Sequence, residues 1–382
     1  MEVDLIILGG GCAGLSLALN LAKQGTACPN TLILEKREAY SNDRTWGFWQ
    51  QQPTLFDQLI SKRFSRMRVK TGNEFCTLNC ASTPYSVLEA RDFYQHALGV
   101  ISALPNIQLQ LGTAVLSSPQ KNGDRWKIET SNATYFAKQV VDTRPQPLSP
   151  HSSRGLYQSF YGVEVECEND LFDPSCLDLM DFERESRFPI LFTYLIPSSK
   201  KRALIEITVF SETALQQDSL KPEMVRKLKK QLQGSSFKII REESGILPMG
   251  TAFPPISLDE TYVYAGLTSG AARPSTGYAF QRIQEWAVLC AEELKNKRLP
   301  ISHVSDPWLI RTMDKIFISV LRSRPELAPQ LFYALFSRVS TPRVIRFLSG
   351  RPLLLDCLKI VLAFPTLVFL AELPKALKCH RG

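Results

Sequence analysis

The first 25 residues have the pattern of a strand, a glycine-rich turn and a helix. Residues 3–8, VDLIIL, form a continuous apolar run of strand length, and the glycines of GGGCAG follow directly. The next stretch, LSLALNLAKQG, has a helical pattern that ends at Gly25. A second apolar run, NTLILEK, begins at Asn30. This βαβ opening predicts a parallel sheet with a crossover helix.

The glycines of this turn are spaced for a dinucleotide. Gly9, Gly11 and Gly14 form a Gly-x-Gly-x-x-Gly triplet, and Glu35 ends the second strand. The first glycine allows the tight turn, the second lets a pyrophosphate approach the backbone, and the third packs helix against strand. The helix N-terminus offers N–H groups and partial positive charge to the pyrophosphate, and Glu35 offers its carboxylate to the ribose hydroxyls. The combination predicts a dinucleotide site without distinguishing FAD from NAD.

A second glycine-rich stretch, AGLTSGAARPSTGYAF, lies near residue 270 and favours FAD. Gly266 ends a strand, Pro274 and Gly277 precede a long helical pattern, and Ser275 and Thr276 are expected to cap that helix. The dipole of such a helix end suits a flavin ring or its phosphate, whereas the plain alternative is an ordinary helix start after a loop. The two elements bracket the chain between them, which fits an FAD domain built from both halves.

The middle of the chain changes to alternating strands. SFYGVEVEC, ILFTYLIP and RALIEITVF have a period of two, and PSSKK at residues 197–201 is a clear hairpin turn. We therefore predict an α/β fold in which a Rossmann-type FAD-binding domain with a parallel sheet carries an inserted antiparallel sheet and a C-terminal helical subdomain. The expected boundaries are residues 1–150 and 240–300 for the FAD domain, 151–239 for the substrate-binding sheet and 301–382 for the basic, apolar helical segment.

All of the net charge of +8 lies in the last fifth of the chain. From Pro307 onward there are 12 Lys and Arg residues against 4 Asp and Glu residues. They alternate with aliphatic and aromatic runs, which favours an anionic membrane surface over nucleic acid. Asp356, Lys359 and Pro365 interrupt the longest apolar stretch and argue against a clean transmembrane span. A packed helical subdomain with a solvated basic face is an equally weighted alternative.

Cysteine and histidine usage points to a metal-free protein of the cytoplasm. The nine cysteines form no Cys-x-x-Cys pair, so we expect reduced thiols. The N-terminus lacks the pattern of a signal peptide. The four histidines are scattered and indicate neither a metal site nor a catalytic triad. We expect a cytoplasmic protein that associates peripherally with the membrane.

Six motifs in order resemble the bacterial and plant lycopene cyclases. They are ILGGGCAGLSLA, NDRTWGFW, VVDTRP, FTYLIPSSKKRALIEITVFS, ESGILPMG and GAARPSTGYAF, and they cover roughly residues 1–290. The resemblance implies an FAD-dependent cyclisation of the ψ-ends of lycopene, or a related acyclic carotenoid, to β-ionone rings. It also implies that NAD(P)H reduces the flavin and that the substrate undergoes no net redox change.

The resemblance assigns roles to individual residues. Glu206 in LIEIT matches the catalytic acid of the family, and RTWGFW matches a signature near flavin and substrate that includes Arg44, Trp46 and Phe48. Arg91 in EARDFY either reaches the pyrophosphate from a helix start or forms a surface ion pair. The flavin-binding positions carried over are Gly9, Gly11, Gly14, Glu35, Gly266, Pro274, Thr276 and Gly277.

Two departures accompany this match. Ile207 stands where many relatives carry a second acid, which removes a helper carboxylate from that position. DTRP replaces the common Asp-x-Arg-Gly, which leaves the roles of Asp142 and Arg144 open. Neither departure affects Glu206.

Protonation of an isolated alkene requires a carboxylic acid that keeps its proton at neutral pH. A free glutamate has a pKa of about 4.3, and burial in an apolar pocket raises it. The alternation of RALIEITVF makes both faces of the strand apolar apart from Thr208, which predicts an interior position for Glu206. The aromatic faces expected to stabilise the cations are those of Trp46, Phe48, Phe192 and Tyr194.

Two other functions compete with the cyclase. One is a flavin oxidoreductase that acts on a hydrophobic isoprenoid, such as a hydroxylase or a polyprenyl reductase. The other is a non-enzymatic flavoprotein-like binding protein, against which the intact glycine motifs argue. A buried acid on the substrate sheet separates the cyclase from the hydroxylase, because hydroxylation needs no such group.

Overall fold

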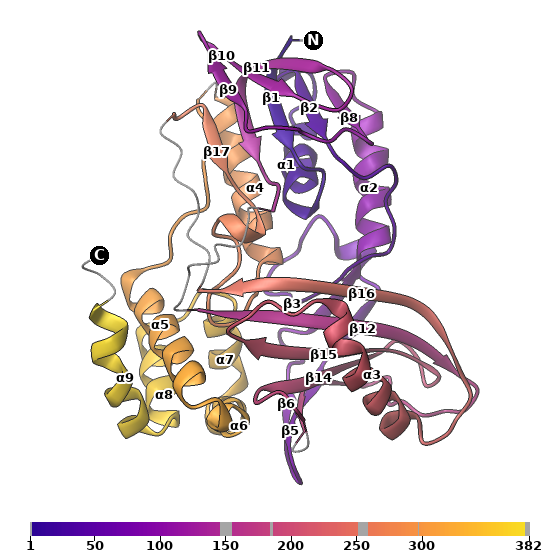
Figure 1. Ribbon diagram of the computed structural model, residues 1–382, viewed down its shortest axis with the longest axis vertical. Helices are drawn as coiled ribbons and strands as arrows, with labels where there is room; N and C mark the ends of the chain where they lie inside the picture. The colour runs from indigo at the N-terminus through magenta and orange to yellow at the C-terminus, as the bar shows by residue number, and fades with distance from the viewer. Residues whose placement is uncertain (1, 146–154, 184–185, 251–258, 297, 379–382) are drawn as a thin grey trace.

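The computed structural model describes residues 2–145, 155–183, 186–250, 259–296 and 298–378 (Figure 1). The N-terminal sheet lies at one end of the molecule, a long antiparallel sheet crosses the middle, and the C-terminal helices lie beside it (Figure 1). This arrangement confirms the predicted α/β class with parallel and antiparallel sheets and a helical C-terminal region.

The N-terminal sheet has the predicted βαβ opening. β1 (Glu2–Leu8) pairs in parallel with β2 (Thr31–Leu34) and with β11 (Thr134–Asp142), and α1 (Cys12–Ala22) makes the crossover. The strands run in the order β8-β2-β1-β11-β10-β9, and β17 also pairs with β11. The remaining members are β8 (Ile107–Gln110), β9 (Gln120–Asn122), β10 (Arg125–Glu129) and β17 (Tyr262–Tyr264).

Burial on both faces explains the continuous apolar run of β1. Leu5 and Ile7 pack against α1, α2 (Ala90–Ser102) and α4 (Phe280–Lys295), while Ile6 and Leu8 join a second cluster on the opposite face. Strands of parallel sheets are commonly covered in this way, because their crossover helices lie against the sheet.

The antiparallel sheet has the strand order β16-β12-β15-β14-β13-β5-β6. Its PSSKK turn is the predicted hairpin, in which the Ser198 N–H donates to the Arg202 carbonyl at 2.9 Å. Strands from outside residues 151–239 extend the sheet at both edges. The members are β5 (Arg66–Thr71), β6 (Glu74–Asn79), β12 (Leu156–Cys167), β13 (Cys176–Phe182), β14 (Leu191–Pro197), β15 (Arg202–Ser211) and β16 (Phe237–Met249).

β15 is buried on both sides, as its sequence predicts. Ile205 and Ile207 pack with the apolar residues of α3 (Gln217–Leu232). Phe210, on the opposite face, joins a core that includes the C-terminal helices. A small sheet of β3 (Thr45–Trp49), β4 (Lys62–Phe64) and β7 (Tyr85–Glu89) contributes Trp49, Phe64 and Tyr85 to the same core.

Prolines divide the C-terminal region into short helices. Pro342 lies in the first turn of its helix, where its missing N–H costs no hydrogen bond, and Pro365 separates the last two helices. The helices are α5 (Trp308–Ser323), α6 (Ala328–Arg338), α7 (Thr341–Leu348), α8 (Leu354–Ala363) and α9 (Thr366–Lys378).

The third glycine of the triplet fixes α1 against β1. A Cβ atom at Gly14 would lie 2.0 Å from the carbonyl oxygen of Gly9 and 3.1 Å from Ile7 Cγ2. Because one of these neighbours is backbone, the clash has no side-chain rotation to relieve it. Gly99, on α2, has open space in the same direction.

We therefore expect opposite effects from two helical glycine-to-alanine substitutions. Gly14→Ala should destabilise the protein by about 3 kcal/mol, because the added methyl group forces α1 away from the sheet. Gly99→Ala should stabilise it by about 0.5–1 kcal/mol through helix propensity. Chemical denaturation of both variants measures the difference, and equal stabilities would contradict the packing described for Gly14.

Candidate active site

The glycine turn after β1 forms an open cradle at the N-terminus of α1. Gly9 has φ = 97°, a left-handed conformation that favours glycine, and Gly11 precedes Cys12 as the N-cap. A Cβ atom at Gly11 would meet nothing closer than Arg37 Nη2 at 4.0 Å. The cradle thus leaves room for a phosphate to approach the backbone at a helix N-terminus, which fits the pyrophosphate of a dinucleotide.

Glu35 is buried beside this cradle and is already hydrogen-bonded. The Gly10 N–H donates to its carboxylate at 2.7 Å, and Arg37 pairs with it at 3.1 Å. Burial by itself would raise the pKa of Glu35, but the hydrogen bonds from Arg37 and Gly10 outweigh it and hold the pKa below the ordinary value. Arg37 also lies over the rings of Tyr40 and Tyr94. An adenosine ribose at Glu35 would therefore take over hydrogen bonds that Arg37 now makes.

The second glycine-rich element packs directly against the first. A Cβ atom at Gly266, where φ is 91°, would lie 3.3 Å from the Ala13 Cβ at the start of α1. The Gly266 N–H donates to His303 Nε2 at 3.0 Å. Burial lowers the pKa of His303 to about 3, so this ring is neutral and acts as an acceptor. Two chain segments far apart in sequence thus form one site.

The expected capping role of Ser275 and Thr276 is wrong. α4 begins at Phe280 after Ala279, without a side-chain cap. The Ser275 hydroxyl instead donates to Asp314 on α5 at 2.8 Å, beside a fully buried ion pair of Arg273 and Asp314 at 2.9 Å. The buried carboxylate of Asp314 needs hydrogen-bond donors, and Ser275 supplies one of them. The Ser275 hydroxyl is therefore directed to α5 and does not cap α4.

Other predicted cofactor residues lie around these two elements. Gly277 has φ = 71°, and a Cβ atom there would lie 2.8 Å from Gln158 Oε1 on β12. Arg91, at the start of α2, is largely exposed and pairs with Glu89 and Asp92. Pro274 and Thr276 belong to the loop between Gly266 and α4.

The buried Asp142 and the partly exposed Arg144 form a support at the end of β11. Arg144 pairs with Asp142 at 2.7 Å, and the Tyr262 hydroxyl donates to the same carboxylate at 2.7 Å. Because Tyr262 belongs to β17, these bonds tie β17 to β11. The DTRP motif thus braces the sheet beneath the glycine cradle.

Glu206 lies in the middle of β15 on the face directed towards the C-terminal core. The Thr208 hydroxyl donates to its carboxyl group at 3.1 Å. Part of its surface stays open, but protein surrounds it deeply enough for burial to be the main cause of a strongly raised pKa. The negative charge of Glu243 raises the pKa further, and Arg44 opposes that effect. Burial and the nearby carboxylate of Glu243 both favour the protonated form of Glu206.

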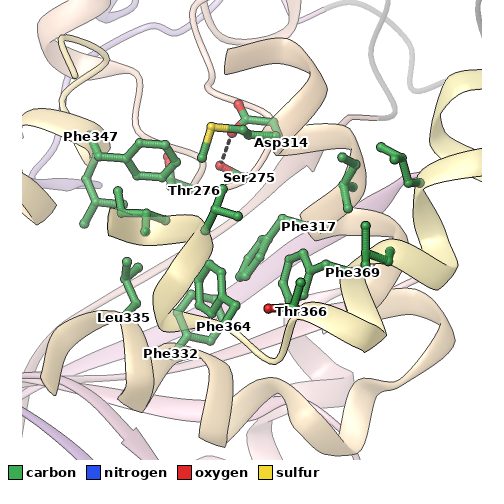
Figure 2. A pocket seen from close by; sticks show the side chains of 17 residues that line it. Ser275, Thr276, Asp314, Phe317, Phe332, Leu335, Phe347, Phe364, Thr366 and Phe369 are labelled. Atoms are coloured by element: carbon green, nitrogen blue, oxygen red, sulfur yellow. Dashed lines mark hydrogen bonds between the residues drawn. The ribbon is translucent and has the colours of Figure 1, made fainter. Parts of the chain in front are cut away.

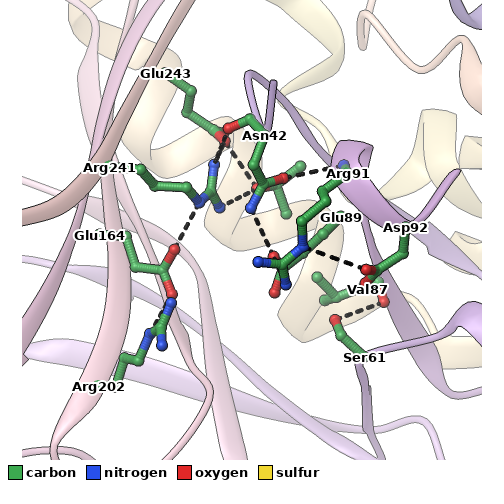
Figure 3. A network of polar contacts seen from close by, with 11 residues as sticks. Asn42, Ser61, Val87, Glu89, Arg91, Asp92, Glu164, Arg202, Arg241 and Glu243 are labelled. Carbon is green, nitrogen blue, oxygen red and sulfur yellow. Dashed lines mark hydrogen bonds and ion pairs between the residues drawn. The ribbon is translucent and has the colours of Figure 1, made fainter. Parts of the chain in front are cut away.

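Glu243, on β16, belongs to a line of alternating charges (Figure 3). Arg241 pairs with Glu243 at 2.5 Å and with Glu164 at 2.6 Å, and Arg202 pairs with Glu164 at 2.6 Å. The Thr45 hydroxyl donates to Glu243 at 2.8 Å. The line therefore joins the antiparallel sheet to the start of β3.

Aromatic hydroxyls gather around the acid. Tyr194 is paired across β14 and β15 with Glu206, and burial followed by the charges of Tyr85 and Glu206 raises its pKa. Tyr85 and Tyr278 lie close together, because both rings contact Trp49, with centroids 5.2 and 5.3 Å from it.

Gly47 makes room for this group. A Cβ atom at Gly47 would lie 2.2 Å from the Tyr85 hydroxyl, so the glycine of the WGFW motif lets the tyrosine ring lie over the strand.

The aromatic residues predicted for substrate divide into two groups. Phe192 lies beside Tyr194, with ring centroids 5.4 Å apart, on the face of the sheet that carries Glu206. Trp46 and Phe48 both stack on Phe280 of α4, at 5.4 and 4.9 Å, in the core of the N-terminal part. The structure brings the first group to the acid and places the second between β3 and α4.

An apolar cavity of about 220 Å³ lies among the C-terminal helices (Figure 2). Phe317, Phe332, Phe364 and Phe369 line it, with Ser275 and Thr276 at one side. The Phe332 ring also contacts Phe210 on β15, with centroids 6.2 Å apart. The cavity therefore adjoins both the second glycine-rich element and the strand of Glu206.

Comparison with known families shows the family to which the chain belongs. A family model described as "Lycopene cyclase protein" matches residues 4–373. The chain belongs to the lycopene cyclase family. Among relatives, the lycopene beta cyclase of Capsicum annuum is 26% identical over 309 residues, which cover 73% of this chain and 58% of that protein. The lycopene beta cyclase of Synechococcus elongatus is 23% identical, over 72% of this chain and 68% of that protein. The chain thus spans less than two thirds of the plant relative.

Solved structures place this family member in a wider group of folds. A geranylgeranyl bacteriochlorophyll reductase-like protein from Thermoplasma acidophilum superposes with a TM-score of 0.63 at 15% identity, over 98% of this chain and 99% of that one. A flavin-dependent monooxygenase determined in complex with FAD and substrate superposes with a TM-score of 0.59 at 11% identity, over 99% of this chain and 72% of that one. These likenesses establish the fold of this lycopene cyclase family member.

Four residues of the candidate site were not predicted from the sequence. Glu243, Tyr85, Tyr278 and Arg241 all lie near Glu206, although no role was predicted for them. Glu243 and Tyr278 are nevertheless inside family motifs, ESGILPMG and GAARPSTGYAF. A polar residue inside a motif is the signal that could have found them.

We expect Glu206→Gln to stabilise the protein at neutral pH. Folding raises the pKa of Glu206, so its contribution to stability is complete below the unfolded pKa and is lost as pH rises through the folded pKa. Glutamine cannot ionise, so the variant places no second charge beside Glu243. Thermal melting at pH 4 and pH 8 should show a higher Tm for the variant only at pH 8. An equal or lower Tm at pH 8 would mean that Glu206 is not a costly buried acid.

Proposed function

We propose that this protein is an FAD-dependent lycopene beta-cyclase that starts ring closure by protonating the substrate from Glu206. The observation that carries the proposal is the environment of Glu206, a carboxyl group with a strongly raised pKa beside the aromatic rings of Tyr194 and Phe192. A carboxylic acid of this kind keeps its proton at neutral pH and can donate it. Membership of the lycopene cyclase family supports a carotenoid substrate.

The proposed reaction needs one proton and returns it. Glu206 donates its proton to C2 of a ψ-end of lycopene, and a tertiary cation forms at C1. The electron pair of the 5,6-double bond forms the C1–C6 bond and moves the positive charge to C5. Loss of the C6 proton to the Glu206 carboxylate then forms the 5,6-double bond of the β-ring. Substrate and product are isomers, so no net oxidation or reduction occurs.

Aromatic rings near Glu206 suit this cationic path. Tyr194 lies directly across from the acid on β14, and Tyr85 is close enough for the charge of Glu206 to raise its pKa further, after burial. The negative face of an aromatic ring attracts a cation and provides no nucleophile that would trap it. We propose that Tyr194 and Phe192 face the substrate at the reacting end.

The two glycine-rich elements would hold the flavin. Gly9, Gly11 and the start of α1 would bind the pyrophosphate, Glu35 the ribose, and the loop from Gly266 to Gly277 the flavin end. A reduced flavin bound there would supply negative charge near the cation. We propose NAD(P)H as its reductant.

The similarity of fold supports a second candidate function, a flavin oxidoreductase that acts on an isoprenoid. A protein described as geranylgeranyl bacteriochlorophyll reductase-like shares the fold over nearly the whole chain. Reduction of an isoprenoid does not require a buried acid on the substrate sheet, whereas cyclisation does. Glu206 therefore favours the cyclase.

Pigment analysis tests the function directly. Produced in a bacterium that accumulates lycopene, the protein should convert it to a cyclic carotene, and Glu206→Gln should lower conversion by at least about a hundredfold, the lower range for loss of a general acid. Bound flavin should be unchanged in the variant. Unconverted lycopene beside soluble, flavin-loaded wild-type protein would rule out the cyclase, and an active variant would remove Glu206 from the mechanism.

We further propose that α8 and α9 dock the protein on the cytoplasmic face of an anionic membrane. Within the described part of the chain, no single helix is long and apolar enough to cross a bilayer; α8 and residues 366–373 pass that test only as a pair bent by 108°. α8 buries Cys357 and Ile360, yet its outer side is also apolar, with Leu354 78% exposed. Leu367 on α9 is 82% exposed. Apolar side chains on the outer side of a helix that no protein covers fit the lipid interface.

Vesicle sedimentation tests this surface. The triple change Leu354→Ser, Leu358→Ser and Leu367→Ser should lower binding to vesicles of phosphatidylcholine and phosphatidylglycerol by more than about tenfold, because each leucine loses apolar burial in lipid. Changing Phe75 and Leu116, which are 63% and 68% exposed elsewhere, to serine should leave binding unchanged. Equal losses in both variants would contradict docking through α8 and α9.

A further inference from the structure

Three residues on neighbouring strands lie in one line across the antiparallel sheet. Glu206 on β15 pairs with Gly162 on β12, and Gly162 pairs with Glu243 on β16. Directly opposed residues in a sheet point to the same face, so both carboxyl groups lie on one side. The middle position has no side chain to separate them.

The space over Gly162 is filled by Glu243, Leu204 and Glu206, and Leu204 Cδ1 would lie 3.2 Å from a Cβ atom there. A Cβ atom at Gly162 would lie 3.0 Å from Glu243 Cγ and 3.5 Å from Glu206 Cβ. The charge of Glu243 reaches Glu206 over this gap and raises the pKa of Glu206, after burial as the main cause. Two carboxylates this close repel each other, so a proton on one of them is favoured.

The partners of each carboxyl group show where that proton lies. Glu243 pairs with Arg241 at 2.5 Å and accepts from the Thr45 hydroxyl at 2.8 Å. Among the residues that the structure describes, Glu206 accepts a hydrogen bond from the Thr208 hydroxyl at 3.1 Å and takes part in no ion pair. The carboxyl group with the ion pair holds the negative charge, and the other holds the proton.

We propose that Glu243 is a positioning residue that keeps the proton on Glu206, and that Gly162 is the gap through which the two carboxyl groups meet. This inference rests on the proposed role of Glu206 as the acid. During turnover the proton leaves Glu206 for C2 and returns from C6, while Glu243 keeps its charge throughout. Two adjacent carboxylates repel each other, so ionised Glu206 beside Glu243 is a strong acceptor for the C6 proton.

Four other charged or titratable residues lie around the two glutamates. Arg241 follows Glu243 on the same strand, and Arg44 precedes β3 and acts against the raised pKa of Glu206. The phenols of Tyr85 on β7 and Tyr194 on β14 face Glu206, and their pKa values are raised chiefly by burial. Apart from burial, the negative charge of Glu243 is the largest cause that raises the pKa of Glu206.

Glu243→Gln tests the proposal through the pH profile of the enzyme. Removing the anion should shift the alkaline limb of kcat to lower pH by at least about one unit, which is a tenfold loss of protonated Glu206 on that limb. The KM for lycopene should stay within about twofold, because Glu243 acts on the acid and not on the substrate. An unshifted limb would overturn the proposal.

The matched control is Glu242→Gln. Glu242 is the neighbouring residue on β16, on the opposite face, where it accepts from the Tyr161 hydroxyl at 2.9 Å. Its replacement removes the same charge from the same strand without touching Glu206. A shift of the limb as large as that of Glu243→Gln would attribute the effect to net charge and overturn the proposal.

A second measurement is independent of cyclase activity. Infrared difference spectra of the purified protein during pH titration should contain one protonated carboxyl band that disappears in Glu206→Gln and titrates at lower pH in Glu243→Gln. Gly162→Ala retains both carboxyl groups but separates them, and should shift the band in the same direction even where Glu243→Gln does not fold. A band unaffected by both changes would overturn the inference. The expected shift in a protein that converts no lycopene would support the pair and overturn the proposed function.

Discussion

The removal of one carboxyl group from water is the constraint around which the middle of this structure is organised. Glu206 lies on a strand that is buried on both faces. Charged residues on the neighbouring strands pair with one another and so offset the cost of burying their charges. Arg202, Glu164, Arg241 and Glu243 form a line of alternating charges that ends at the acid. Each buried charge in the line has a partner of opposite sign, whereas burial and the charge of Glu243 favour the protonated form of Glu206.

The same sheet positions the acid relative to the glycine-rich elements. Gly277 meets Gln158 on β12, the strand that also carries Gly162, and the rings of the next residue, Tyr278, and of Tyr85 both contact Trp49. At the other end of the same loop, Gly266 packs on the first turn of α1. One loop therefore contacts both the dinucleotide cradle and the strand next to that of Glu206.

Local patterns were enough to predict the parts of the site that are continuous in sequence. The turn after β1, the PSSKK hairpin and the burial of RALIEITVF all depend on residues close together in the chain. Glu243 was not predicted, because its contact with Glu206 is created by the pairing of β16 with β12, over a separation that no local pattern encodes. The same kind of tertiary contact, between Ser275 and Asp314, explains the failed capping prediction.

Ile207 shows how alternation decides which acid can assist Glu206. The residue after Glu206 on β15 points to the opposite face, where Ile207 packs against α3, so an acid there would face α3 and not Glu206. A helper on the correct face has to come from another strand, in register and without an intervening side chain. Glu243 meets the first requirement and Gly162 the second. The absence of an acid at residue 207 therefore leaves the pair at Glu206 intact.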